Sequence, residues 1–221
     1  TAEKDTGAAN IMVNDLTGDN AIIVVPGAAD LLRPQDVEKA ESVIQNSSVF
    51  MTNLEVPVET MHKGLELARK HQVKTIFNPA PAVEFPESVY PLCDYFTPNE
   101  TEAAELAGVP VSNVNEAREA ARIFRERGVK TSLFTLGEMG CYFMNDEGEG
   151  HVPAFDMSGK VVETTGAGDG FNGGFAAALA EGKSLDHSIR YGSATAAISV
   201  TRLGTAPAMP VKSEIDELMI G

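Results

Sequence analysis

The sequence predicts an α/β protein with a mostly parallel, doubly wound sheet and helices on both of its faces. Short apolar, β-branched runs alternate along the chain with stretches whose apolar residues recur at helical spacing, and this alternation is typical of a parallel sheet. The 221 residues are enough for one large domain with a sizeable core. In the last third, the β-branched pair Val161-Val162 meets a glycine-rich turn, and an apolar, alanine-rich helix starts there.

The first 26 residues are expected to form a β-hairpin instead of an α/β unit. Its strands cover Asn10–Asn14 and Ala21–Val25, and the polar turn Asp15–Asn20 joins them. The pattern then changes to alternating helix and strand. We therefore expect a small β unit over residues 1–26 and an α/β core over residues 27–221.

Within the core, each element follows from its apolar spacing. The expected strands cover Ser48–Leu54, Thr75–Phe77, Tyr95–Thr97 and Thr131–Leu136, and a β-hairpin begins at Cys141–Met144. Two expected helices are marked by apolar stripes, one of Val37, Ala40, Val43 and Ile44 and one of Met61, Leu65 and Ala68. The later expected helices cover Thr101–Ala107, Glu116–Arg127, the segment after the glycine turn, Leu185–Arg202 and Ser213–Met219. Ligands of such sheets bind beyond the carboxyl ends of the strands.

Composition limits the partners of the chain. The formal net charge of −15 argues against nucleic acid, because binding to the phosphate backbone requires a basic surface. No apolar run is long enough to span a membrane. Cys93 and Cys141 have no metal-binding or redox spacing, so we expect them to be small buried hydrophobes in a reducing, cytoplasmic compartment.

The glycine-rich turn Gly166–Asp169 is the strongest candidate site. A helix start exposes unpaired backbone N–H groups and the positive end of the helix dipole, which together favour a phosphate. A carboxylate at Asp169 suits a general base that takes a proton from a hydroxyl attacking a phosphoryl group. The alternative is a structural helix start with Asp169 as its N-cap. Gly173 and Gly174 are expected to let the helix pack closely on the sheet or a nucleotide.

Two other glycine patterns in this region are weaker. The spacing Gly168-x-Gly170-x-x-Gly173 fits a dinucleotide-binding turn, but two successive helical stretches follow it where a βαβ unit would be needed. The tripeptide Gly182-Lys183-Ser184 imitates the end of a P-loop, but it follows a helix instead of opening one.

The string from Val161 to Phe175 resembles the C-terminal signature of the ribokinase-like sugar kinases, the phosphofructokinase B family. The resemblance implies a ribokinase-like fold and phosphorylation of D-ribose by ATP to D-ribose 5-phosphate. It also implies that Gly166, Ala167 and Gly168 form the anion hole and that Asp169 is the catalytic base and contacts the sugar.

The resemblance also implies a nucleotide site. Asn99-Glu100-Thr101-Glu102 matches the N-x-x-E motif, in which Asn99 faces the phosphates and Glu102 holds Mg²⁺ through waters. The same two residues suit a helix cap and its third position. Ser193 stands near the adenine, and Gly168 and Asp169 also touch ATP. In the family a glycine turn contacts ATP, and it corresponds here to Thr135, Leu136, Gly137, Glu138, Met139 and Gly140. Met139 stands where relatives usually carry a basic residue.

Sugar and monovalent-cation sites follow by the same resemblance. Glu55, at the end of an expected strand, matches a carboxylate that contacts the sugar hydroxyls, and the loop Asn78–Ala82 is typical of ribokinases. A K⁺ ion would organise the anion hole, and Glu163 stands where the family usually has Asp. The implied K⁺ ligands are Glu163, Thr165, Ser199, Arg202, Gly204 and Ala208.

Compared with the family pattern, roughly 90 residues are expected before the point that matches Thr1, including a glycine-rich sugar motif and further strands of a β lid. The hairpin would then be part of that lid, and the full-length form a homodimer through it, located in the cytoplasm and in a eukaryote also in the nucleus. A short chain would phosphorylate ribose weakly. Two alternatives stay open: a nucleotide-binding remnant without catalysis, and another sugar or nucleoside kinase of the same family.

Overall fold

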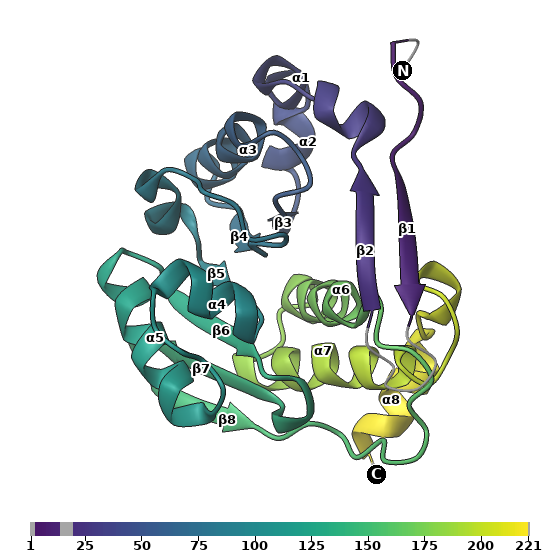
Figure 1. Ribbon diagram of the computed structural model, residues 1–221. Helices are drawn as coiled ribbons and strands as arrows, with labels where there is room; N and C mark the ends of the chain where they lie inside the picture. The colour runs from purple at the N-terminus through teal and green to yellow at the C-terminus, as the bar shows by residue number, and fades with distance from the viewer. Residues whose placement is uncertain (1–2, 14–19, 221) are drawn as a thin grey trace.

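The computed structural model describes residues 3–13 and 20–220, and its centre is a six-stranded sheet with helices on both faces (Figure 1). The strand order is β3-β4-β5-β6-β7-β8; the first four strands are parallel, and β7 and β8 continue the sheet as an antiparallel hairpin. The predicted fold class is confirmed. The strands are β3 (Val49–Thr52), β4 (Lys74–Phe77), β5 (Tyr95–Phe96), β6 (Thr131–Thr135), β7 (Cys141–Asn145) and β8 (Gly148–Val152).

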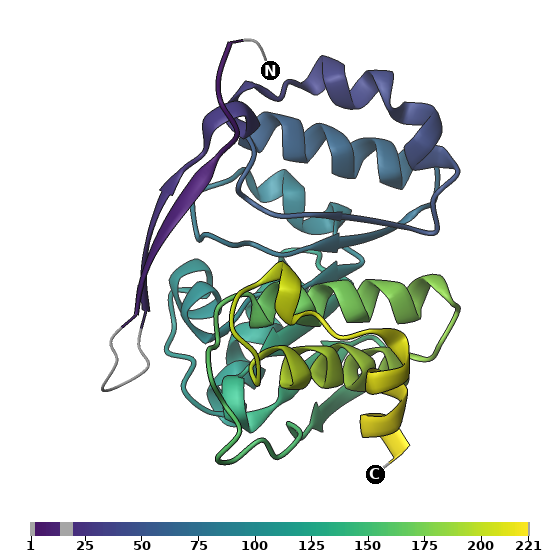
Figure 2. The same cartoon turned by 90° about the vertical axis from the view of Figure 1, so that its right-hand side faces the viewer.

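Two groups of helices cover the sheet, and α6 and α7 run side by side on one face (Figures 1 and 2). On the other face lie α3 (Val58–Lys70), α4 (Glu100–Ala107) and α5 (Val114–Glu126), and α1 (Pro34–Lys39) and α2 (Glu41–Gln45) pack on α3. The first face carries α6 (Ala167–Ala180) and α7 (Leu185–Ser199), with α8 (Lys212–Ile220) against α7. Short 3₁₀ helices occur at Gly27–Leu31, Glu87–Leu92, Gly137–Met139 and Ala206–Ala208.

Alternation along the strands explains why both faces are covered. Successive side chains of a strand point to opposite faces, so Phe77 and Phe134 join the core under α3 to α5, whereas their neighbours Ile76 and Leu133 join the core under α6 and α7. All four side chains are fully buried. Cys93 and Cys141 are free and buried, as predicted.

One predicted element is wrong, and one β-branched pair forms no strand. The stripe from Val37 to Ile44 is not one helix: the backbone leaves helical geometry at Ala40, which ends α1 and precedes α2, and Val43 is 68% exposed. The pair Val161-Val162 forms no strand, because the Val162 amide donates to the Val200 carbonyl instead of a sheet neighbour. The other predicted core elements are found, with ends shifted by a few residues.

A separate two-stranded sheet, β1 (Ala8–Val13) paired antiparallel with β2 (Asn20–Val25), stands off from the helical layers (Figure 2). Both strands lie close to their predicted positions, and the predicted turn falls largely on residues 14–19, outside the described part of the chain. Its apolar side chains are exposed, with Ile23 and Val24 each at 57%. This hairpin therefore presents an apolar surface that the described chain does not cover.

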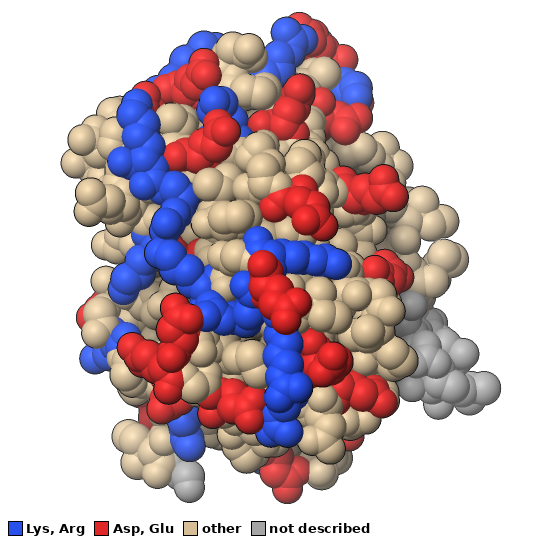
Figure 3. Space-filling model, turned by 90° about the vertical axis from the view of Figure 1, so that its left-hand side faces the viewer, with Lys and Arg blue, Asp and Glu red and all other residues tan. Residues whose placement is uncertain are grey.

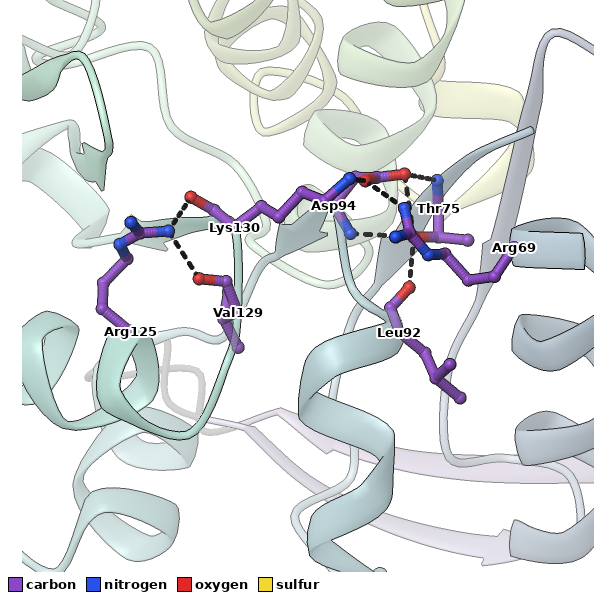
Figure 4. Close-up of polar contacts among 7 residues, drawn as sticks. All are labelled: Arg69, Thr75, Leu92, Asp94, Arg125, Val129 and Lys130. Atoms are coloured by element: carbon purple, nitrogen blue, oxygen red, sulfur yellow. Dashed lines mark hydrogen bonds and ion pairs between the residues drawn. The ribbon is translucent and has the colours of Figure 1, made fainter. Parts of the chain in front are cut away.

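At the amino ends of the strands, Asp94 ties three elements together (Figure 4). Its Oδ1 accepts hydrogen bonds from Arg69 at 2.8 Å and Lys130 at 2.7 Å, and its Oδ2 accepts one from the Thr75 amide at 2.9 Å. Arg69, Lys74 and Lys130 line a cavity of about 460 Å³ here. Because the cavity lies at the amino edge of the parallel strands, it does not belong to the site at their carboxyl ends.

Charge is mixed over the face in Figure 3, where Lys and Arg side chains form a band among Asp and Glu. On α5, Arg118 forms an ion pair with Glu149 at 2.9 Å. Within the described residues, no helix is both long and apolar enough to cross a membrane.

Candidate active site

The loops that follow the parallel strands meet at one edge of the sheet. The carboxyl ends of parallel strands lie at the same edge, and backbone hydrogen bonds of 2.9–3.2 Å connect each loop to the next. This edge therefore collects the residues predicted for the sugar, the metal ion and ATP. The connecting amide–carbonyl pairs are Leu54–Ala80, Thr97–Phe77 and Thr135–Pro98.

The start of α6 contains Gly166, Ala167 and Gly168, the residues predicted for the anion hole. Gly166 is the N-cap, in the left-handed conformation with φ 80°, and Asp169 is the third helical residue, so the alternative of Asp169 as N-cap is wrong. The Ala167 amide donates to the Thr164 carbonyl and the Gly170 amide to the Gly166 carbonyl. Within the described residues, the amides of the N-cap Gly166 and of Gly168 and Asp169 have no acceptor. Those of Gly168 and Asp169 lie in the first turn of α6, so these two N–H groups are available beside the exposed Asp169 carboxylate.

Glycine is required at position 166 for two reasons. A side chain there would adopt φ 80°, which L-residues rarely do, and its Cβ would lie 3.2 Å from Thr205 Cγ2. The turn is thus pressed against the segment that follows α7, which contains the residues predicted for K⁺.

Asn99 and Glu102 form a reciprocal helix cap at the start of α4, as predicted. The Glu102 amide donates to Asn99 Oδ1, and the Asn99 amide donates to Glu102 Oε2, both at 2.9 Å. Glu102 is only 8% exposed, and burial raises the pKa of its carboxyl, although the Asn99 amide opposes this shift. One carboxylate oxygen remains without a protein donor among the described residues, so the geometry leaves Glu102 able to face a cation.

The predicted ATP turn is a 3₁₀ turn closed by the Leu136 amide, which donates to the Gly140 carbonyl at 2.7 Å. A Cβ at Gly137 would lie 3.4 Å from Glu100 Oε1, so this turn borders the start of α4. Glu138 and Met139 at its tip are exposed. The turn therefore joins the same edge as Asn99 and Glu102.

Ser193 and Glu55 differ in their surroundings. Ser193 lies on α7 and faces β7, with its hydroxyl 3.6 Å from Cys141 Sγ and only 9% of the residue exposed. Glu55 is exposed in the loop after β3, and within the described residues its carboxylate has no partner. Glu55 is thus free to bind a ligand, whereas the Ser193 hydroxyl is turned into the core.

The residues predicted for K⁺ lie on two segments that pack together. Glu163 Oε2 accepts a 3.0 Å hydrogen bond from the Gly204 amide, which lowers the pKa of Glu163, with a further contribution from the nearby Thr165 hydroxyl. Thr165 Oγ1 is buried without a partner of standard hydrogen-bond geometry in the described chain. Ser199 and Ala208 are buried close by, and the Arg202 side chain pairs with Glu214.

The two segments, joined by the Glu163–Gly204 bond, present oxygens that fit a monovalent cation. The carbonyls of Thr165, Arg202 and Gly204 accept no hydrogen bond from any described residue. Neutral oxygen donors of this kind suit a hard cation of low charge. Protein ligands for a divalent ion are lacking, because the described residues contain no group of three or more His, Cys, Asp or Glu that could hold one. Mg²⁺ at Glu102 would therefore take its other ligands from phosphates and water.

Two polar residues of this edge escape prediction from the sequence. Thr97 and Asn172 are both buried, and the Thr97 hydroxyl donates to Asn172 Oδ1 at 2.8 Å although the two are 75 positions apart. The one signal in the sequence is a polar Asn172 within the apolar run Phe171–Phe175.

Comparison with known proteins places these features in a family. The profile described as pfkB family carbohydrate kinase matches residues 1–212. A ribokinase of Haemophilus influenzae is 37% identical over 218 residues, covering 99% of this chain and 70% of that protein. A deoxyribokinase of Salmonella typhi is 34% identical over 215 residues, covering 97% of this chain and 69% of that protein. The structure of an Arabidopsis thaliana ribokinase complexed with ribose and ATP matches with a TM-score of 0.88 and 28% identity over 98% of this chain and 70% of that one.

Proposed function

The chain belongs to the pfkB family of carbohydrate kinases, and we propose that it transfers the γ-phosphoryl group of ATP to the 5-hydroxyl of D-ribose. One observation carries the proposal: two free amides and an exposed carboxylate share the first turn of α6, at the edge where the loops of β3 to β6 meet. The ribokinase relatives support ribose as the acceptor.

In this reaction Asp169 accepts the proton of the 5-hydroxyl, and the hydroxyl oxygen forms a bond to the γ-phosphorus. The bond between that phosphorus and the β–γ bridging oxygen breaks, and ADP leaves with the electron pair. The amides of Gly168 and Asp169 donate to the transferring phosphoryl oxygens, where charge must be stabilised.

Asn99 and Glu102 would hold the nucleotide end. Mg²⁺ bound with ATP would neutralise charge on the phosphates, and Glu102 would hold it through water. The capping hydrogen bonds with Asn99 keep the Glu102 carboxylate in place before the ligand arrives. The turn Thr135–Gly140 borders the same ligand.

A K⁺ ion would sit behind the anion hole, among Thr165 Oγ1 and the carbonyls of the facing segment. Support comes from the unpaired buried hydroxyl and from the contact between Gly166 and Thr205. A cation there would fix the turn that aims the two amides.

The exposed Glu55 would bind the sugar hydroxyls, and the hairpin β1-β2 would cover the sugar as a lid. The lid of one chain would pair with that of a second copy, because the hairpin exposes apolar side chains such as Ile23 and Val24 that a partner could bury. A second acceptor, 2-deoxyribose, is favoured by the deoxyribokinase relative.

The test is an ADP-release assay with ATP, Mg²⁺, K⁺ and either ribose or 2-deoxyribose, with mass spectrometry of the sugar phosphate. We expect ribose-dependent ADP formation that falls by about 10²–10⁴ in Asp169→Asn, with little change in ATP affinity. A rate in Asp169→Asn within about threefold of the unaltered chain would show that Asp169 is not the base.

Titration calorimetry separates catalysis from simple nucleotide binding. A kinase binds both ATP and ribose, whereas a remnant binds ATP alone. A preference for 2-deoxyribose in kcat/KM would assign the second acceptor instead of the first.

A further inference from the structure

We infer that Thr97 is a positioning residue that aligns the anion-hole turn through Asn172, an inference that rests on the proposed function. Thr97 follows the two-residue strand β5 and is only 1% exposed. Its backbone and side chain together connect the end of β4 to α6.

Three groups of Thr97 are bound by three different partners. Its amide donates to the Phe77 carbonyl at 2.9 Å, and its carbonyl accepts from Asn78 Nδ2 at 2.8 Å. Its hydroxyl donates to Asn172 Oδ1 at 2.8 Å. The first two bonds anchor Thr97 to the end of β4 and the start of the Asn78–Ala82 loop, so the hydroxyl is held at a fixed point.

Asn172 passes this anchor on to the anion hole. Its Nδ2 donates to the Gly168 carbonyl at 3.0 Å, one turn earlier in α6, and the residue is only 4% exposed. The Gly168 carbonyl belongs to the peptide whose N–H is that of Asp169, one of the two free amides. The chain Thr97–Asn172–Gly168 therefore sets the orientation of that peptide relative to the loops after β4 and β5.

Burial makes the hydroxyl hard to replace. Without it, Asn172 Oδ1 would lose its donor in a place that water does not reach, and the amide side chain would turn to find another. Such a turn would remove the side-chain bond to the Gly168 carbonyl and leave only the helix to orient that peptide. Misalignment of a catalytic group by about 1 Å can reduce a rate by about 10²-fold, so a small movement here would be measurable.

The experiment compares Thr97→Val, which keeps the shape and removes the hydroxyl, with Thr97→Ser, which keeps the hydroxyl. The control is Thr75→Val, which removes an equally buried hydroxyl at the opposite edge of the sheet. Calorimetry measures the affinity of each protein for ADP with Mg²⁺, alone and with aluminium fluoride as a transition-state mimic. Steady-state assays measure kcat and KM with ribose and ATP.

We expect Thr97→Val to lose about 10–100-fold in kcat and in affinity for ADP–aluminium fluoride, with ADP affinity and KM values nearly unchanged. Thr97→Ser should stay close to the unaltered chain, and Thr75→Val should lose thermal stability without changing the ratio of the two affinities. Amide hydrogen exchange at Gly170 should accelerate in Thr97→Val only, which tests the alignment even where turnover is slow.

The inference would be overturned if Thr97→Val and the unaltered chain had the same ratio of affinity for ADP–aluminium fluoride to affinity for ADP, and the same amide exchange rate at Gly170. A similar loss in Thr97→Val and Thr75→Val would also overturn it, because the effect would then be general destabilisation. Absence of ribose phosphorylation by the unaltered chain would refute the proposed function, and the exchange comparison would still decide the role of Thr97.

Discussion

Replacement of Gly174 by alanine tests how closely α6 packs on α7. A Cβ at Gly174 would lie 2.3 Å from Thr195 Oγ1, 2.9 Å from Thr195 Cβ and 3.1 Å from Gly192 Cα. Rotation of the Thr195 side chain could move its hydroxyl, at the expense of its bond to the Tyr191 carbonyl, but not its Cβ or the backbone of Gly192. The added methyl group therefore forces the two helices apart.

Gly173→Ala is the matched control, because Gly173 is the preceding residue of α6 and is exposed. Among the described residues, no atom outside its own helix turn lies within 4 Å of the position that a Cβ would take there. Both changes gain about 0.5–1 kcal/mol of helix propensity, so this contribution cancels between them. The difference is the packing cost, about 1–3 kcal/mol. At roughly 2–4 °C per kcal/mol for a domain of this size, a cost of about 2 kcal/mol separates the two melting temperatures by about 4–8 °C.

Differential scanning calorimetry of both variants measures this difference. We expect Gly173→Ala to melt slightly above the unaltered chain and Gly174→Ala clearly below it. If Gly174→Ala melts as high as Gly173→Ala, α6 and α7 do not touch at Gly174 and the packing described for this face is wrong. Activity should follow the same order, since α6 carries the proposed anion hole and Asp169.

Further expected outcomes concern binding, the cation, the thiols and the amino edge of the sheet. Glu55→Ala should raise KM for ribose about 10–100-fold with little change in KM for ATP, because a hydrogen bond to a charged group contributes roughly 1.5–3 kcal/mol; equal rises in steady-state assays would mean a structural role. Activity should be higher in K⁺ than in tetramethylammonium, and Glu163→Asp should keep this preference; equal rates in the two salts would remove the cation site. Cys93 and Cys141 should react with Ellman's reagent only after unfolding, since both are buried and burial raises the pKa of Cys141 to about 12; fast labelling of the native chain would contradict their burial. Asp94→Asn removes the charged partner of two cations, so it should lower the free energy of unfolding by about 1–3 kcal/mol, measured by urea denaturation, and leave KM for ribose unchanged. An altered KM would place Asp94 in contact with the site.

Local chemistry made much of this protein predictable from its sequence. The Asn99–Glu102 cap forms because its donors and acceptors are three residues apart, and nothing distant is needed to place them. The glycine turn before α6 and the alternating strands Lys74–Phe77 and Thr131–Thr135 are equally local. The family resemblance rests on the same contiguous strings.

Local patterns are poor guides to structure where a distant segment contacts the same residues. The β-branched pair Val161-Val162 has the composition of a strand, but the Val162 amide donates to the Val200 carbonyl at the end of α7. The apolar stripe from Val37 to Ile44 has helical spacing, but Val43 is exposed while Ile44 is buried and Val37 partly buried against α3, and the helix breaks at Ala40. Tertiary contacts overrode local preference in both cases.

The sequence by itself determined the candidates for chemistry: the glycine turn with Asp169, the capped Glu102 and the acidic Glu55. Only the tertiary structure decided how they are joined, because the bond from Thr97 to Asn172 links positions 75 residues apart and the bond from Gly204 to Glu163 links positions 41 residues apart. No local rule relates such positions, since their approach depends on how the strands order in the sheet and how α6 and α7 pack on it. The sequence therefore shows which hydrogen-bond donors and acceptors are present, whereas their alignment depends on the fold.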